Sequence, residues 1–480
     1  MFWGILTALI VLWFFSYIRF YADNGFYGDQ VHFLIMTQSI IEDDDLDVKN
    51  QYLNGSYWDF YIDPTYKPID PHLPKYKFDE NSPAWYPLHN PALSMYLVPA
   101  FWVMGAKGAL YAMIALDLLV LVLLYFWILQ ISNSKTGAIL GVAVMMSAPF
   151  FLSQIGYIFT DLPILALMLG SLLVFFKPGK KWWDYLLLST LLGVGVWLHV
   201  KMILPMGTMG VLMLFEILNA KNDNNRAINL GAMILPAMVL VGLFEWKLNQ
   251  WYGVWLPTSS FAGDQMLKVN PANSLSAYLF DRNQGLLTIN PGFWLVFLGL
   301  PAWYAKKFHI SNLKSQKNCK KNNVQDLFAG KQQLAKLAII LGPLFLVHLT
   351  FDDWCGGYSP AGRYMISFWP ILLPAVGFVW EKMISVWLKI LIGILAAWQT
   401  LYSFFMIYYR ATWALCGARN NIFIAIENKT GWALDKFWPV FNGAVDLEEG
   451  KKLVSLGLLY LVIVGLLVVG WRLNRTHFKV

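Results

Sequence analysis

Long apolar stretches recur along almost the whole chain and are separated by shorter polar segments. A helix that crosses a bilayer needs about 20 mostly apolar residues. Such stretches fall near residues 2–19, 107–129, 136–153, 162–176, 183–199, 203–219, 229–248, 290–305, 336–351, 364–381, 385–408 and 452–471. The pattern therefore predicts an all-α polytopic membrane protein with about 12 transmembrane helices, of which residues 2–19 form an uncleaved first crossing.

Two polar segments are too long to be simple turns between crossings. Residues 20–105 are rich in proline, tyrosine, aspartate and asparagine, and this composition predicts a large loop. Within it, residues 29–41 and 91–104 are apolar enough to form helices that lie along the membrane surface. A second large loop is expected over residues 249–290. The chain shows no internal repeat, so residues 1–480 are predicted to form one transmembrane domain.

Basic residues are concentrated in short connections, namely 177–183, 219–226 and the basic loop 306–335. Such an excess of Lys and Arg is typical of cytoplasmic loops. The two large polar loops then lie on the opposite face. We therefore expect a multi-pass protein of the plasma (inner) membrane whose active site is on the extracytoplasmic side.

Composition supports the membrane assignment and narrows the possible partners. The chain is 58% hydrophobic and 14% charged, whereas soluble proteins have roughly 45–50% and about 25%. The net charge of +7 resides in the short loops and not on a folded basic domain, so no nucleic-acid partner is expected. The three cysteines are too few and too scattered for a disulfide framework or a zinc site.

Four ionisable residues are predicted at the outer ends of crossings: Asp29, Asp161, Lys201 and Arg363. Charged groups at this depth are costly and are usually functional. Two acids and two bases on one face are suited to binding a phosphate and activating a hydroxyl group. Structural alternatives remain open at this point: Asp29 as a helix cap, Lys201 reaching to the interface, and Arg363 as an interfacial anchor.

Other polar residues in the first loop are less specific. His32 shares a helical face with Asp29 and could orient its carboxylate or contact an acceptor, although a structural role is equally compatible. His89 stands at the start of the second surface helix. The acidic run at residues 42–47 is spaced loosely like a calcium loop, but it lacks the central glycine and the later glutamate, which favours a solvated helix end.

The order of several motifs resembles that in the GT-C glycosyltransferase superfamily. Residues 28–34, GDQVHFL, are similar to the "GDEPHYL" opening loop of bacterial members, a group that includes protein O-mannosyltransferases and the lipid A aminoarabinose transferase. The similarity continues through residues 37–52, the loop before Asp161, NQWYG at 249–253 and RNQGLLTINP at 282–291. It ends in GGYSPAGRYMISFWPILLP at 356–374, and it covers about three quarters of the chain.

The resemblance implies an inverting transfer of a sugar from a polyprenyl-phosphate donor to an extracytoplasmic acceptor hydroxyl. By this comparison Asp29 is the general base, and Asp161 is a second acid that positions the acceptor or a divalent cation. Arg363 and Lys201 are expected to hold the donor phosphate. His32, His89 and Tyr358, which lie in the same loops, are predicted as further substrate-binding residues.

The sequence departs from the family pattern at two places, and two alternative functions stay open. The acid that follows the first aspartate in the family is Gln30 here, and Ala361-Gly362 replaces the usual Gly-Pro before the arginine. A polytopic transporter or lipid-linked-glycan flippase, and an oligosaccharide ligase or polymerase, are the alternative functions. No cofactor is implied apart from a divalent cation at Asp29 and Asp161, and the acceptor is left open as a glycan, a lipid or a protein.

Overall fold

The structure is a computed structural model that describes most of the chain. The described residues are 11, 13, 26, 28–60, 83–220, 224–253, 255, 271–282, 284–305, 329–350, 359–360, 363–381, 386–408, 413–414, 421–431, 438–439 and 449–476. Nearly all of the predicted first crossing lies outside this set. The same holds for residues 306–328 of the basic loop, for parts of both large loops, and for Tyr358.

The described chain is almost entirely helical, as the apolar pattern predicts. The helices are α2 (Asp29–Glu42), α3 (Lys49–Leu53), α4 (Ala92–Ser132), α5 (Lys135–Met146), α6 (Pro149–Leu152), α7 (Asp161–Phe175), α8 (Trp182–Leu198), α9 (Ile203–Asn219), α10 (Arg226–Tyr252), α11 (Pro271–Phe280), α12 (Leu286–Ile289), α13 (Trp294–Tyr304), α14 (Ala329–Thr350), α15 (Pro374–Glu381), α16 (Val386–Tyr408), α17 (Asn421–Thr430) and α18 (Glu449–Thr476). Short 3-10 turns are η1 (Ser56–Phe60), η3 (Val200–Met202), η6 (Pro291–Phe293), η8 (Arg363–Met365) and η9 (Trp369–Leu372). The two-residue strands β1 (Ser359–Pro360) and β2 (Trp413–Ala414) pair antiparallel.

Six helices in the described part of the chain are long and apolar enough to cross a membrane. They lie within α4, η3 with α9, α10, α14, α16 and α18, and the shorter apolar helices include α5, α7 and α8. The prediction of an all-α polytopic membrane protein is confirmed at this level. The total of about 12 crossings stays a prediction, as does the placement of two helices along the membrane surface.

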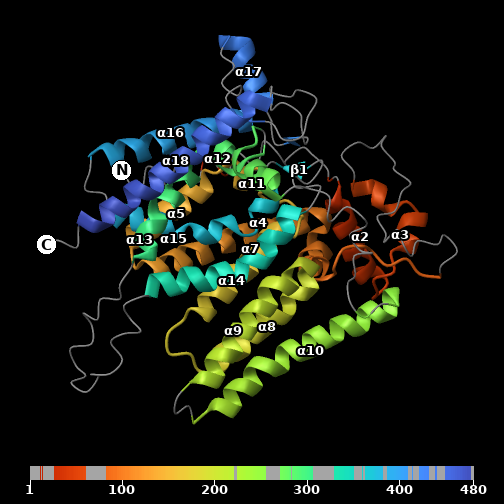
Figure 1. The fold of residues 1–480 in the computed structure, drawn as a ribbon. Helices are drawn as coiled ribbons and strands as arrows, with labels where there is room; N and C mark the ends of the chain where they lie inside the picture. Colours follow the sequence, from red (N-terminus) through yellow and green to blue (C-terminus); the bar gives the residue numbers. More distant parts are fainter. Residues whose placement is uncertain are drawn as a thin grey trace.

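The helices form three neighbouring groups (Figure 1). The central group consists of α4, α5, α7, α13 and α15, which pack on one another in pairs. On one side, α8 packs along α10 and joins the centre through α7, and on the other side α18 packs on α13. Helix α2 packs on α4 at one end of the molecule, where α3 also lies.

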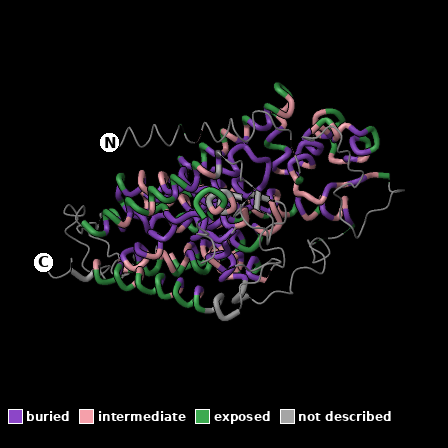
Figure 2. The backbone as a smooth tube through the Cα atoms, turned by 90° about the horizontal axis from the view of Figure 1, so that it is seen from above, coloured by how far each residue is buried: buried purple, intermediate pink, exposed green. Residues whose placement is uncertain are grey.

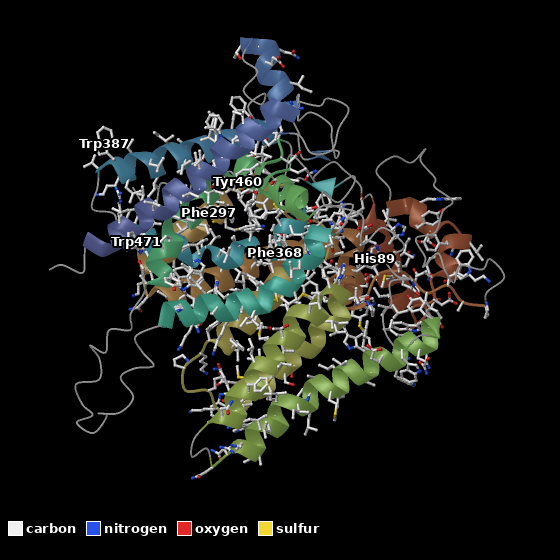
Figure 3. The ribbon with its side chains drawn as sticks, in the orientation of Figure 1. His89, Phe297, Phe368, Trp387, Tyr460 and Trp471 are labelled. Atoms are coloured by element: carbon white, nitrogen blue, oxygen red, sulfur yellow. The ribbon has the colours of Figure 1, made fainter. Side chains whose placement is uncertain are left out.

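Buried residues fill the middle of the molecule, and exposed positions are frequent on its outer helices (Figure 2). Many of these exposed positions carry large apolar side chains. In Figure 3, Trp387 and Trp471 extend from the outer helices α16 and α18, whereas Phe368 lies inside. Trp387 is 79% exposed, and Phe368 is buried. An apolar surface of this kind is stable against lipid but not against water.

Helix α4 runs from Ala92 to Ser132, but its direction changes sharply at Gly105. The backbone there has φ 60° and ψ −149°, which only glycine adopts readily. The hydroxyl of Tyr96 donates to the carbonyl of Ala112 at 2.9 Å, so the two parts fold back against each other. Residues 92–104, which the sequence predicts as a separate surface helix, are therefore a distinct arm of α4.

Two predicted crossings contain breaks at proline. The crossing near 136–153 consists of α5 and α6, which begins at Pro149, and the crossing near 364–381 consists of η8, η9 and α15. Proline has no N–H group and clashes with the preceding turn, so it starts a helix more easily than it continues one. The segment that carries Arg363 is therefore built of short turns before α15.

Helix α2 begins and ends within one residue of the predicted range. Ser94 of α4 donates to the carbonyl of Phe33 at 2.9 Å, which fixes the two helices together. After α2, Asp45 accepts the backbone N–H of Asp47 at 2.9 Å, and Asp47 accepts that of Trp85 at 2.7 Å. The acidic run thus closes a turn of the backbone at a helix end.

Candidate functional site

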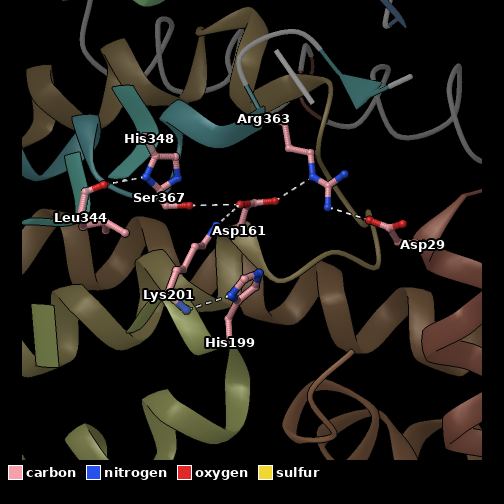
Figure 4. A network of polar contacts seen from close by, with 8 residues as sticks. All are labelled: Asp29, Asp161, His199, Lys201, Leu344, His348, Arg363 and Ser367. Atoms are coloured by element: carbon pink, nitrogen blue, oxygen red, sulfur yellow. Dashed lines mark hydrogen bonds and ion pairs between the residues drawn. The ribbon is translucent and has the colours of Figure 1, made fainter. Parts of the chain in front are cut away.

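Arg363 lies between two carboxylates that are far from it in the sequence. Its Nη2 donates to Oδ2 of Asp29 at 2.8 Å, and its Nε donates to Oδ2 of Asp161 at 3.0 Å (Figure 4). The partners are 334 and 202 positions away along the chain. The fold therefore brings α2, α7 and η8 together at one guanidinium group.

Asp161 begins α7 and is the most buried member of this group, with 1% of its side chain exposed. Its Oδ1 accepts from Nζ of Lys201 at 3.0 Å and from the hydroxyl of Ser367 at 3.2 Å. Burial alone would raise the pKa of Asp161, but Lys201 and Arg363 hold it well below its usual range. Asp161 is therefore ionised and poorly basic.

The Arg363 side chain is enclosed by both carboxylates and an aromatic ring. Its Cζ lies 3.9 Å from the centre of the Phe159 ring, a cation–π contact. Burial disfavours the charge of Arg363, but Asp29 and Asp161 outweigh this effect and raise its pKa above the ordinary value. The arginine is 14% exposed and carries a fixed positive charge.

Asp29 is the first residue of α2 and follows a glycine that turns the chain. Gly28 has φ 57° and ψ −140° and is the N-cap position. Asp29 therefore lies inside the helix and does not cap it. Its side chain is 25% exposed, and Oδ1 lies 3.8 Å from Nε2 of His89. Asp29 is thus the more accessible of the two acids.

The two predicted histidines occupy different positions relative to Asp29. His89 stacks on Phe33 with 4.6 Å between ring centres, and it stands beside Asp29. His32 shares a hydrogen bond of 2.6 Å between its Nδ1 and the hydroxyl of Tyr52. The two imidazole rings are 6.3 Å apart. His89 is therefore next to the ion cluster formed by Asp29, Asp161, Lys201 and Arg363, whereas His32 pairs with Tyr52.

Gln30 occupies the position where the family has an acid, and its side chain faces the protein interior. Its Oε1 accepts the backbone N–H of Ile158 at 3.2 Å. On the other side of the same loop, Oδ2 of Asp117 in α4 accepts the N–H of Gly156 at 2.7 Å. These two acceptors hold the loop that carries Phe159 into α7.

Sequence reasoning missed three residues that complete this environment: Phe159, His199 and Ser367. Phe159 stands two positions before Asp161, and Ser367 four positions after Arg363. A spacing of four places Arg363 and Ser367 on one face of a helical turn, so the sequence could have indicated Ser367 as a neighbour of the site. His199 accepts the backbone N–H of Lys201 on Nδ1 at 3.1 Å, which no sequence pattern indicates.

The two acids do not form a cation site in this arrangement. The Arg363 guanidinium lies between them, and Lys201 also binds Asp161, so two positive charges balance two negative ones. Among the described residues, no group of three or more His, Cys, Asp or Glu side chains is placed to hold a metal ion. A divalent cation placed between the two carboxylates would compete with the guanidinium for that position. The arrangement instead suits an anion that takes the remaining N–H groups of Arg363 and Lys201.

Comparisons with known proteins identify the fold. No protein-family model matches the sequence, and no curated protein is significantly similar to it. Among solved structures, ArnT from Cupriavidus metallidurans in the apo state is similar, with a TM-score of 0.51 and 12% identity over 98% of this chain and 74% of that chain. ArnT bound to undecaprenyl phosphate has a TM-score of 0.48 and 11% identity over 98% and 76%. The Archaeoglobus fulgidus oligosaccharyltransferase in the apo form has a TM-score of 0.44 and 9% identity over 98% and 56%.

At this level of identity the likeness concerns the fold. The sequence resemblance to the GT-C superfamily implied a polytopic helical membrane protein of the aminoarabinose transferase type. The chain is similar in fold to the ArnT structure, which confirms the architecture that the resemblance implied.

Proposed function

We propose that the chain is a membrane glycosyltransferase that moves a sugar from a polyprenyl-phosphate donor to the hydroxyl group of an extracytoplasmic glycan, lipid or protein acceptor. The observation that carries the proposal is the bridge that Arg363 forms between Asp29 and Asp161. It assembles a cation for a phosphate and a carboxylate for a hydroxyl at one place.

The reaction forms one bond and breaks another. The acceptor oxygen attacks the anomeric carbon of the sugar, and the bond from that carbon to the phosphate oxygen breaks. The electron pair of the broken bond stays on the phosphate, and the acceptor proton goes to Asp29. Attack from the face opposite the leaving group inverts the configuration of the sugar.

Asp29 is the better base because of its surroundings. Asp161 is nearly fully buried, and its oxygens accept hydrogen bonds from Lys201, Ser367 and Arg363. Such bonds stabilise the carboxylate and reduce its affinity for a proton. Asp29 is more exposed, so an acceptor hydroxyl can reach its carboxylate. Asp161 instead holds the two cations in position.

Arg363 and Lys201 stabilise the leaving phosphate. A guanidinium group has five N–H donors, and among the described residues Asp29 and Asp161 take two of those of Arg363, so three remain for a ligand. The donor is a phosphodiester with one negative charge, and the released phosphomonoester gains a second. Fixed cations in a partly buried site favour that increase in charge.

The proposal is tested by transfer with the purified protein in lipid nanodiscs. Polyprenyl-phosphate sugars are supplied with membrane acceptors, and wild type is compared with Asp29→Asn. We expect about a 10³-fold loss of turnover, within the usual range for a missing general base. Asp59→Asn, an exposed acid of η1 in the same loop, is the matched control and keeps wild-type turnover.

Two results would overturn the proposal. One is turnover by Asp29→Asn equal to that of wild type, with both proteins shown to be folded by size-exclusion chromatography. The other is movement of the intact lipid across sealed vesicles without any covalent change, which would establish the transporter alternative.

A further inference from the structure

His199 is a half-buried histidine beside the ion cluster with no role in the step above. It lies between α8 and η3, with an extended backbone at φ −163° and ψ 135°. Its Nδ1 accepts the backbone N–H of Lys201 at 3.1 Å. This bond fixes the imidazole ring relative to the residue whose ammonium group binds Asp161.

The same bond determines where the imidazole carries its proton. A backbone N–H can only donate, so Nδ1 must present its lone pair. The proton of a neutral imidazole is then on Nε2. Burial and the nearby charge of Lys201 lower the pKa of His199 well below its usual range, which keeps the ring neutral. His199 is therefore an uncharged donor with a defined direction.

Nε2 of His199 faces the ion cluster. In Figure 4 the ring nitrogen that is not bonded to Lys201 is turned toward the side on which Asp161 and Arg363 lie. The charges of Lys201, Asp161 and Arg363 all act on the pKa of the ring. In the described part of the chain, no residue forms a hydrogen bond with Nε2.

A neutral N–H donor can bind an anion in this site without changing its net charge. The charges of Asp29, Asp161, Lys201 and Arg363 sum to zero, and both cations already bind carboxylates. A phosphate that enters such a site can use the remaining N–H groups of Arg363 and Lys201, but the positive charges of both are already balanced by the carboxylates. An imidazole N–H supplies a further donor without an additional charge to desolvate.

We propose that His199 binds the phosphate of the lipid donor by donating Nε2–H to a phosphate oxygen, beside Lys201 and Arg363. The inference rests on the proposed function, because it takes the bound anion to be a polyprenyl phosphate. It adds a residue that neither the motif pattern nor the charged cluster identifies.

Two substitutions separate this role from a purely structural one. His199→Asn keeps an acceptor near the position of Nδ1 for the Lys201 N–H but has no donor at the position of Nε2. His199→Gln places an amide N–H near the position of Nε2 but lacks the nearer acceptor. A phosphate-binding role predicts that Gln substitutes better than Asn, and a structural role predicts the reverse order.

The measurement is the affinity of the full-length protein in nanodiscs for undecaprenyl phosphate, with undecaprenol as the control lipid. We expect His199→Asn to bind undecaprenyl phosphate about tenfold more weakly than wild type, and His199→Gln to remain within about threefold. Binding of undecaprenol should be the same in all three proteins. Thermal unfolding should show the opposite order, with His199→Asn closer to wild type.

The inference is overturned if His199→Asn binds undecaprenyl phosphate as tightly as wild type, or if His199→Gln is the weaker binder. Because this lipid carries no sugar, the result is separate from the transfer reaction. Wild-type protein that binds the lipid phosphate in this pattern but transfers no sugar would refute the proposed function and support the role of His199. Wild-type protein that does not bind the lipid phosphate would refute both.

Discussion

The helices α7, α8 and α9 have an ion cluster at each end, and the two clusters differ in net charge. At one end, Asp161 opens α7 and Lys201 precedes α9. At the other end, Lys177 follows α7 and binds Asp184 of α8 at 2.7 Å, while Glu216 of α9 binds Lys180 and Lys336. A helix of this length separates the clusters by on the order of 20 Å.

The clusters use the same kinds of side chain but differ in burial and balance. Glu216 and Lys336 are each 35% exposed and Lys177 is 47% exposed, although Asp184 and Lys180 are largely buried. Three lysines there meet two acids. Such pairs contribute little to stability, and their positive excess is typical of a cytoplasmic face. The Asp161 cluster is centred on a carboxylate that is 1% exposed, its charges balance, and it joins segments hundreds of residues apart. Because burying charges is costly, the comparison favours the Asp161 cluster as the candidate site.

The largest expected contrast between the ends is in turnover. Arg363→Lys should lower transfer by about 10³-fold, because an ammonium point charge cannot reproduce a fork that spans two carboxylates and a phosphate. Lys336→Ala at the other end should stay within about twofold of wild type. Both are measured with the nanodisc transfer assay, and similar losses in the two variants would contradict the comparison.

The next contrast is in stability. Asp161→Asn leaves Lys201 without a carboxylate and leaves Arg363 with Asp29 alone, and it should cost about 3 kcal/mol. Glu216→Gln removes a partly exposed partner and should cost less than about 1 kcal/mol. Denaturant-induced unfolding in mixed micelles gives both values. An equal cost at the two ends would show that burial does not distinguish the clusters.

A smaller effect is expected from two glutamines that bond to the backbone near opposite ends of α7. Gln30 accepts from Ile158, and Gln130 donates to the carbonyl of Leu173 at 3.2 Å. Gln30→Met should lower turnover about fivefold, equivalent to one hydrogen bond of roughly 1 kcal/mol. Gln30→Glu keeps an acceptor and should restore most of it, while Gln130→Met should change turnover less than twofold. Turnover by Gln30→Met at the wild-type level would exclude a positioning role.

The smallest expected effect is the response of the buried cluster to mild acid. The folded-state pKa of Asp161 lies below its unfolded value of about 3.9, so its contribution is complete above that value and is lost as pH falls through the folded pKa. The stability difference between wild type and Asp161→Asn should therefore be constant from about pH 8 to about pH 5. A difference that shrinks across this range in unfolding experiments would show that Asp161 is not held ionised.

The sequence predicted the class of protein and the ends of several helices well. Helix α2 begins at Asp29 as expected, because the apolar pattern starts there after a glycine. The division at Gly105 falls between the predicted surface helix 91–104 and the predicted crossing 107–129. The breaks at Pro149 and in the segment of Arg363 were not predicted. Hydropathy averages over about 20 residues and does not register a change of direction within an apolar stretch.

Local sequence by itself determined that this chain belongs in a bilayer and which charged residues stand at the helix ends, because both follow from composition over short windows. Only the tertiary structure decided that Arg363 bridges Asp29 and Asp161, that Gln30 holds the loop before α7, and that His199 has its proton on Nε2. Each of these depends on hydrogen bonds whose partners come from different segments or from the backbone. Such geometry is set by how the helices pack and not by the residues of any one helix.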